Sequence, residues 1–287
     1  MRKQNTIANS VYVDGFGFWS GQDVRMEFQP APENSGIRFF RSDLPDSLPI
    51  PALVEFRIDK PRQTSLRRGD AQVDMIEHVM SALKGLQIDN CDIRINGSEI
   101  PGFDGSGTPF FNALMQAGIA PQKAQQPYRI IDFTDSIGSN DTFIEVRPAL
   151  NNEVVFGYSL LYDSVPNGEK HPIADQSFSF ELTPDSFEKE IMRCRTFLLL
   201  KEAEYLLSKG LCTRVSANDV LVFGDEGPVE NTLLFENECA RHKTLDMIGD
   251  FALAGCDWIG NFHAHKTGHL QNAQAVLELC KRTKLNL

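Results

Sequence analysis

The sequence predicts an α+β protein of two domains, each of which combines a sheet with about two helices. Apolar residues alternate with polar ones before about residue 60, whereas several later segments show helical spacing. The chain has 287 residues, which exceeds one typical domain. A polar segment flanked by prolines, residues 121–127, divides it. We therefore expect an N-terminal domain over residues 1–122 and a C-terminal domain over residues 128–287.

The first half is expected to open with strands and turns. Val24, Met26 and Phe28 alternate with polar residues, as in a half-buried strand. Over residues 73–84 the apolar period becomes helical, and Gly85 is placed to end that helix. The other elements predicted in this half are a strand over 37–40, a strand over 91–95 and a helix over 110–117.

The second half is expected to begin after an unstructured linker, because residues 121–127 show no apolar period. Strands and helices are then predicted in alternation. The predicted strands are 129–133, 142–146, 153–161 and 258–263, and the predicted helices are 201–209, 237–254 and 271–287.

The overall composition excludes several classes of function. The net charge of −11 argues against a nucleic-acid partner, since such proteins need clustered positive charge. No apolar run is long enough to span a membrane, and the first ten residues lack a signal-peptide core. The six cysteines are scattered without a Cys-x-x-Cys pair, which is typical of reduced thiols. We therefore expect a cytoplasmic protein without a membrane span.

Glycine-rich segments exclude three common nucleotide and hydrolase motifs. The third glycine of Gly15-x-Gly17-x-x-x-Gly21 is displaced from the dinucleotide-binding spacing. The segment 104–107 lacks the Lys-Ser/Thr pair of a phosphate-binding loop, and no Gly-x-Ser-x-Gly motif is present for a serine hydrolase.

Two pairs of residues could bind a metal ion. His242 and Asp246 are four positions apart in a predicted helix, so their side chains share one face. Alone, such a pair is more often a surface ion pair than a metal site. Glu77 and His78 favour a metal site over a surface ion pair. Glu77 falls on the apolar side of its helix, where an ionised carboxylate needs a compensating charge. His78, His242 and Asp246 together would leave one coordination position open, as in catalytic zinc sites.

A competing metal site is also visible in the sequence. His263, His265 and His269 lie within seven residues, and the first two share one face of a strand if the strand extends that far. No carboxylate lies close in sequence, and Lys266 would repel a cation. Spacing alone leaves both sites open.

The chain resembles the bacterial UDP-3-O-acyl-N-acetylglucosamine deacetylases, which catalyse the committed step of lipid A synthesis. The similarity covers nearly the whole chain, and its motifs occur in order. They are Thr6-Ile7, Gly15-x-Gly17-x-x-Ser20-Gly21, Pro30-Ala31-Pro32, Val73-Asp74-x-x-Glu77-His78-x-x-Ser81-Ala82, Ile88-Asp89-Asn90, Glu99-Ile100-Pro101-x-x-Asp104-Gly105-Ser106, Arg195-Thr196-Phe197, Gly210-Leu211-Cys212, Arg241-His242-Lys243-x-x-Asp246-x-x-Gly249-Asp250 and Lys266-x-Gly268-His269-x-x-Asn272.

This resemblance implies a fold, a cofactor and a set of roles. Two domains of similar β-α-α-β topology would pack face to face with the site between them, and the protein is expected to be a monomer. The substrate would be a UDP-linked acylated amino sugar. The implied residues are His78, His242 and Asp246 as ligands of zinc (ferrous iron would suit them too), Glu77 as general base, His269 as general acid, Asp250 to orient His269, and Thr196 and Lys243 near the reacting group.

The resemblance also implies an insert over about residues 195–222 that forms an apolar passage for the acyl chain. The sequence departs from the family where Phe18-Trp19 replace the usual Leu-His and Thr213-Arg214 replace Gly-Gly. Trp19 and Arg214 keep open the alternative of a zinc deacetylase of a different acylated sugar. A non-catalytic paralogue that binds a nucleotide sugar or a glycolipid is the other alternative. The residues expected to contact substrate are Phe18, Trp19, Phe197, Leu199, Ala203, Cys212 and Arg214.

Overall fold

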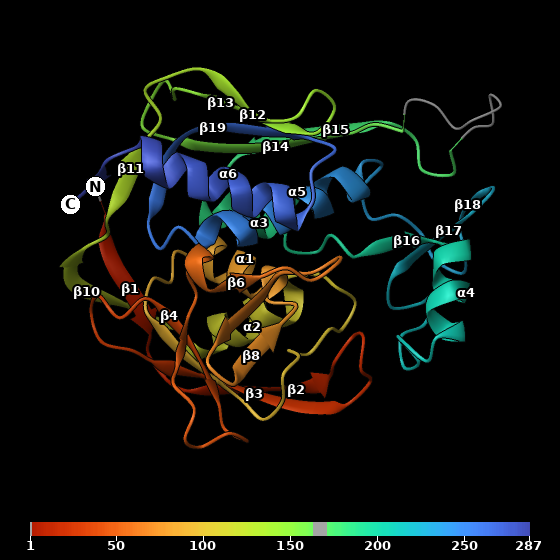
Figure 1. Ribbon diagram of the computed structural model, residues 1–287, viewed down its shortest axis with the longest axis horizontal. Helices are drawn as coiled ribbons and strands as arrows, with labels where there is room; N and C mark the ends of the chain where they lie inside the picture. Colours follow the sequence, from red (N-terminus) through yellow and green to blue (C-terminus); the bar gives the residue numbers. More distant parts are fainter. Residues whose placement is uncertain (1, 163–170) are drawn as a thin grey trace.

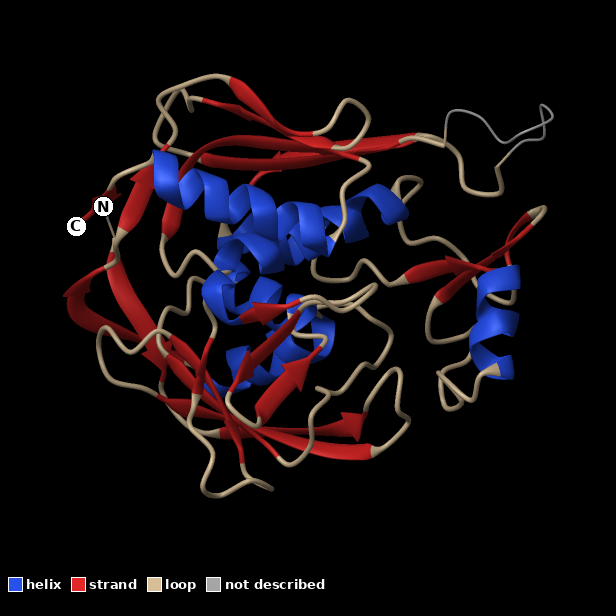
Figure 2. Cartoon of the chain, viewed as in Figure 1, coloured by secondary structure: helices blue, strands red, loops and turns tan. Residues whose placement is uncertain are grey.

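A computed structural model of the protein describes residues 2–162 and 171–287, and it confirms the α+β class. Sheets lie on two opposite sides of the molecule, and the main helices lie between them (Figure 1, Figure 2). No helix in the described ranges is both long enough and apolar enough to cross a membrane. The domain boundaries at residues 122 and 128 stay a prediction.

The N-terminal half contributes a sheet of order β2-β3-β9-β4-β5 and a smaller one of order β6-β7-β8. Helix α2 packs on β2 and on α1, so the apolar face of the sheet is covered. The elements of this half are β1 (Lys3–Ile7), β2 (Val11–Phe16), β3 (Asp23–Pro30), β4 (Ile37–Arg41), β5 (Ile50–Pro51), η1 (Val54–Phe56), β6 (Arg57–Ile58), β7 (Ser65–Arg68), β8 (Ala71–Asp74), α1 (Glu77–Gly85), β9 (Cys91–Ile95) and α2 (Thr108–Ala117).

The C-terminal half is organised around its long strand β19, which pairs with β13 on one side and β14 on the other. Helix α5 packs against β14 and β15, and α6 packs against α5. The elements of this half are β11 (Tyr128–Ile130), β12 (Asp135–Gly138), β13 (Phe143–Arg147), β14 (Val154–Leu160), β15 (Gln176–Glu181), α3 (Pro184–Glu190), α5 (Glu238–Ala252), β19 (Asp257–His265), α6 (His269–Arg282) and β20 (Leu285–Asn286).

The two halves meet where α1 packs against α5. A glycine permits this contact. A Cβ atom placed on Gly249 of α5 would lie only 2.0 Å from the carbonyl oxygen of Glu77, so a larger residue there would force the helices apart. Both helices are mostly buried at this seam. The first turn of α1 is therefore held against the middle of α5.

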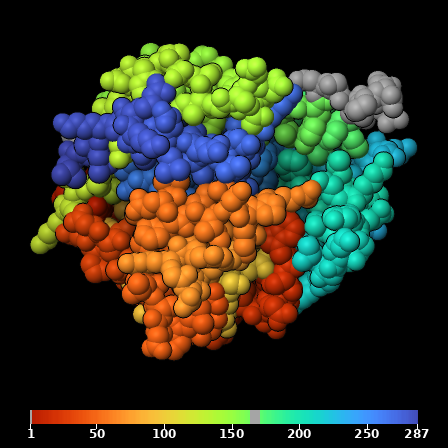
Figure 3. Space-filling model, viewed as in Figure 1, coloured from red at the N-terminus to blue at the C-terminus, as the bar shows by residue number. Residues whose placement is uncertain are grey.

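An insert of the second half lies at one end of the molecule. It consists of β16 (Phe197–Leu199), α4 (Leu200–Ser208), β17 (Leu221–Gly224) and β18 (Gly227–Pro228). The insert rests against the loop between β2 and β3, where the amide of Cys212 donates a hydrogen bond to the carbonyl of Trp19 at 3.2 Å. Figure 3 shows the same arrangement, with the insert (cyan) beside the N-terminal segment (red).

Three expectations about local structure were wrong. The helix expected over 271–287 ends at Arg282, and Leu285–Asn286 form strand β20. Much of the expected linker 121–127 belongs to strand β10 (Ile119–Gln125), which pairs antiparallel with β1. Its side chains alternate between exposed and half-buried, and a strand with so little burial has no apolar period to reveal it. The helix expected over 73–84 begins only at Glu77, because Val73 is a buried residue of strand β8.

Candidate active site

Three helices bring the predicted chemistry to one place. Glu77 and His78 occupy the first turn of α1, and His269 is the first residue of α6. His242 and Asp246 lie one turn apart on α5, as their spacing predicted. Residues from both halves of the chain therefore converge at the seam between α1 and α5.

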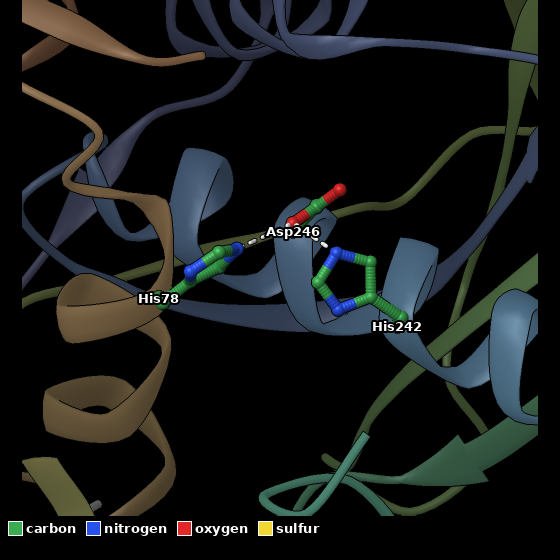
Figure 4. A group of neighbouring side chains, drawn as sticks. All are labelled: His78, His242 and Asp246. Atoms are coloured by element: carbon green, nitrogen blue, oxygen red, sulfur yellow. Dashed lines mark ion pairs between the residues drawn. The ribbon is translucent and has the colours of Figure 1, made fainter. Parts of the chain in front are cut away.

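His78, His242 and Asp246 form a buried group that could hold a metal ion, and their ligand atoms all lie within 4.8 Å of one another (Figure 4). Oδ1 of Asp246 lies 3.4 Å from Nε2 of His78 and 3.5 Å from Nε2 of His242. This buried oxygen has no hydrogen-bond partner among the described residues. A buried carboxylate oxygen that faces two imidazole nitrogens without a hydrogen bond fits a divalent cation, because burial without compensation is costly.

A backbone carbonyl group fixes the orientation of the His242 imidazole. Its Nδ1 lies 3.1 Å from the carbonyl oxygen of Cys194, so Nδ1 carries the proton and Nε2 faces Asp246. Burial lowers the pKa of His242 to about 4 although Asp246 opposes this shift. The ring is therefore neutral, which is the form that binds a metal ion.

Asp246 is held in its charged form. Burial alone would raise its pKa, but Lys243, His242, His78 and His269 together outweigh burial and keep the pKa well below its usual value. Nζ of Lys243 donates to Oδ2 of Asp246 at 2.7 Å. One carboxylate oxygen thus binds a lysine, and the other faces the two histidines.

Glu77 and His269 lie beside this group. Oε2 of Glu77 accepts a hydrogen bond from the amide of Thr64 at 2.9 Å, and Oε1 lies 3.9 Å from Nε2 of His269. Burial raises the pKa of the Glu77 carboxyl. Because Oε2 is bonded to Thr64, Oε1 of Glu77 is the oxygen that faces His269.

His269 is oriented by Asp250. Nδ1 of His269 lies 3.0 Å from Oδ2 of Asp250, which also accepts from Asn272 at 2.8 Å. Burial alone would lower the pKa of His269, but the charges of Asp250 and Glu77 outweigh it and raise the pKa to about 9. His269 is therefore an imidazolium near neutral pH, with Nε2 directed towards Glu77.

This geometry agrees with comparisons to known proteins. A sequence model of the family described as "UDP-3-O-acyl N-acetylglycosamine deacetylase" (LpxC) matches residues 4–281. The chain belongs to this family. The UDP-3-O-acyl-N-acetylglucosamine deacetylase of Anaeromyxobacter dehalogenans (strain 2CP-C) is 38% identical to it over 276 residues, which are 95% of this chain and 86% of the relative. The enzyme of the same name from Teredinibacter turnerae is 37% identical over 283 residues, 98% of this chain and 91% of the relative.

A cavity of about 580 Å³ opens beside the histidines. Of the side chains expected to contact substrate in this family member, Phe18, Trp19 and Phe197 line it. Leu199, Ala203, Cys212 and Arg214 are not among its lining residues in the described chain, so their substrate contacts stay predictions. Arg214 instead pairs with Asp23 at 2.6 Å and lies 4.2 Å over the ring of Phe16.

Sequence reasoning missed several residues of the wall. Residues 59–62 and Tyr162 line the cavity, but neither carries a motif or an apolar period that would mark it. Leu198 and Leu206 also line it, and the apolar run of the insert was their only signal. Glu99 was noted only as part of a motif. Its carboxylate accepts from the amides of Trp19 at 2.7 Å and Ser20 at 3.0 Å, which fixes the loop that carries Trp19.

The competing histidine cluster does not form a group with His269. His263 and His265 lie on the half-buried face of β19, where they line a separate cavity. Nε2 of His263 is 2.8 Å from the hydroxyl of Ser159, and the ring of His265 stacks on Phe143. Within the described residues, the group suited to a metal ion is the one that contains His242.

Proposed function

We propose that this chain hydrolyses the acetamide of UDP-3-O-((R)-3-hydroxyacyl)-N-acetylglucosamine to a free amine and acetate. The observation that carries the proposal is the unpaired Oδ1 of Asp246, which faces His78 and His242 beside Glu77 and His269. The names of the relatives support the substrate. A non-catalytic binding protein would have no need of a buried carboxylate and an imidazolium at this position.

The ion proposed for the site is zinc, held by His78, His242 and Asp246, and ferrous iron would suit the same ligands. A zinc ion bound there would supply Lewis-acid polarisation of a carbonyl and activation of a water molecule. Two imidazole nitrogens and one carboxylate oxygen are the donor set typical of hydrolytic sites with an open coordination position.

The protein's own residues supply the proton transfers. Oε1 of Glu77 accepts a proton from the water that adds to the acetamide carbon, since Oε2 is already bonded to Thr64. The hydroxyl of Thr196 and the ammonium of Lys243, both in the wall of the cavity, stabilise the negative charge that develops on the carbonyl oxygen. Nε2 of His269 donates a proton to the amine nitrogen as the C–N bond breaks, while Asp250 holds Nδ1.

The cavity gives this chemistry a place for the substrate. Phe18, Trp19, Phe197 and Leu206 provide apolar walls on the side of the insert, which suits an acyl chain. The volume of about 580 Å³ is within the usual range for a small-molecule site. We also propose that the enzyme acts in the cytoplasm, because each of its six cysteines is a free thiol.

Turnover assays on a series of substrates test the proposal. Purified, zinc-loaded protein is mixed with UDP-3-O-acyl-N-acetylglucosamines of several acyl lengths, and acetate release is measured. UDP-N-acetylglucosamine without the acyl chain is the control. Acetate release that depends on the acyl chain is the expected result. Bound zinc without turnover of any substrate would favour a different acylated sugar or a non-catalytic ligand.

A further inference from the structure

One face of α5 carries four ionisable residues at intervals of four: Glu238, His242, Asp246 and Asp250. The last three belong to the site already described. Glu238 occupies the same face one turn before His242, and it is fully buried. A buried carboxylate at the end of such a row needs compensation from another charged group.

Arg195 supplies that compensation. Oε1 of Glu238 accepts from the backbone amide of Arg195 at 3.2 Å and from its Nε at 2.9 Å, and Oε2 accepts from Nη2 at 3.1 Å. The amide of Leu234 donates to Oε2 at 2.6 Å. The guanidinium also donates to Asn231 at 2.8 Å and to the carbonyl of Thr232 at 2.7 Å. The ion pair is thus satisfied on both sides, and it binds the backbone of Arg195 as well as the side chain.

The two neighbours of Arg195 both contact His242. The carbonyl oxygen of Cys194 is 3.1 Å from Nδ1 of His242, and the hydroxyl of Thr196 is 3.3 Å from Nε2 of the same ring. The segment 194–196 therefore contacts both nitrogens of the His242 imidazole, and its middle residue, Arg195, is bonded to Glu238.

We propose that the Glu238–Arg195 ion pair is a positioning device that fixes the orientation of His242 and the place of Thr196. The other backbone bonds of this segment run to Ile191, Asp104 and Leu221, none of which lies on α5. Glu238 joins the segment directly to the helix that carries His242. If this contact loosens, the Cys194 carbonyl moves off Nδ1, and the Nε2 lone pair turns away from Asp246.

This inference rests on the proposed function, but it is tested by measurements that do not require turnover. The variants are Glu238→Ala, which removes the contact, and Glu238→Gln, whose amide oxygen can still accept from the backbone of Arg195. Zinc affinity is measured by chelator competition. In metal-free protein, the tautomer of His242 is read from its ¹⁵N chemical shifts. The control is Asp257→Ala, which removes a carboxylate bonded to Arg2 and Lys84 and outside the cavity wall.

We expect Glu238→Ala to weaken zinc binding by about 10- to 100-fold, the usual effect of losing a partner behind a metal ligand. The Nδ1-protonated tautomer of His242 should give way to a mixture. Because neither Glu238 nor Arg195 lines the cavity, kcat should fall while KM stays unchanged. Glu238→Gln should restore most of the zinc affinity, and Asp257→Ala should retain all of it.

The proposal is overturned if Glu238→Ala folds and keeps the wild-type zinc affinity and His242 tautomer. If Glu238→Ala fails to fold, Arg195→Lys decides, because a lysine keeps the charge but cannot bond both carboxylate oxygens, Asn231 and Thr232 together. Wild-type zinc affinity in that variant would equally overturn it. If the wild-type enzyme releases no acetate, the proposed function fails, while the affinity and tautomer measurements still test the positioning role.

Discussion

Oδ2 of Asp250 lies 3.0 Å from Nδ1 of His269, and this carboxylate has no exposure to solvent. The hydroxyl of Thr64, in the N-terminal half, donates a hydrogen bond to Oδ1 of Asp250. The backbone amide of the same threonine donates to Glu77. One residue of the first half therefore connects the group that holds His269 with the carboxylate that faces it.

Replacement of Asp250 by Asn should lower kcat by roughly 10²-fold or more, the scale of general acid catalysis. The imidazole would lose the charge that keeps it protonated and oriented. Steady-state kinetics at saturating substrate measure the effect. The comparison is Thr64→Val, which removes only the hydroxyl donor to Asp250 and should reduce kcat much less. Equal losses in the two variants would contradict an orienting role for Asp250.

Replacement of Glu77 by Gln should leave one zinc ion per chain but lower kcat by roughly 10²- to 10⁴-fold. Glutamine keeps the size of the side chain and cannot accept the proton of water. Metal content by atomic emission and acetate release are measured on the same preparation. His242→Ala is the counterpart, since it should lose metal together with activity. Full metal content and full rate in His242→Ala would show that the site is wrongly assigned.

Replacement of Leu206 by Trp should reduce kcat/KM for long acyl chains more than for short ones, because Leu206 lines the cavity on the side of the insert. The matched change is Arg214→Ala in the same insert. That variant tests the substrate contact expected of Arg214. Because Arg214 does not line the cavity, the variant should change the preference for acyl length less than Leu206→Trp does. It should lose at most about 1 kcal/mol of stability, since its ion pair and ring contact are exposed. A shift in length preference in Arg214→Ala alone would place the passage elsewhere.

Replacement of Asp257 by Asn should destabilise the protein by about 1–3 kcal/mol at neutral pH. Burial alone would raise the pKa of Asp257, but the charges of Lys84 and Arg2 outweigh it and hold the pKa below 3.8. A carboxyl whose pKa is lowered by folding adds stability above its unfolded pKa and loses it as the pH falls through the folded value.

Urea unfolding of both proteins at a series of pH values checks this prediction. The difference in unfolding free energy should be largest near pH 7 and should shrink below about pH 4, the usual range of an aspartate. A difference that stays constant down to strongly acid pH would mean that the Asp257 charge contributes nothing.

The sequence predicted those parts of the site that depend on local spacing. His242 and Asp246 share a face because four residues make about one helical turn, and the burial of Glu77 followed from its apolar neighbours. The meeting of His78 with His242 depends on the packing of α1 against α5, so only the family resemblance could anticipate it. Residues 59–62 lie in the connection between β6 and β7. Tertiary packing brings this connection to the cavity, and its sequence has no periodic signal that would predict this.

The errors in secondary structure have a similar origin. Strand β10 pairs with β1 through its backbone, and that pairing needs no particular side chains. Val73 and Ile76 have the spacing of a helix, but Val73 is buried as a strand residue because β8 pairs with β7. Two apolar residues three positions apart cannot by themselves distinguish a helix from the end of a strand.

The missing side chain at Gly249 has a consequence for how this enzyme can change. The carbonyl oxygen of Glu77 occupies the space that a Cβ atom at position 249 would need. The two halves can approach this closely only because residue 249 is glycine. Side chains of the cavity wall, such as Trp19 and Leu206, can be exchanged without altering this contact. The seam cannot vary in this way, since each added atom would move Glu77 and His78 away from His242 and Asp246. Redesign for new acyl chains can therefore change the cavity wall, but it must keep Gly249 where α5 meets α1.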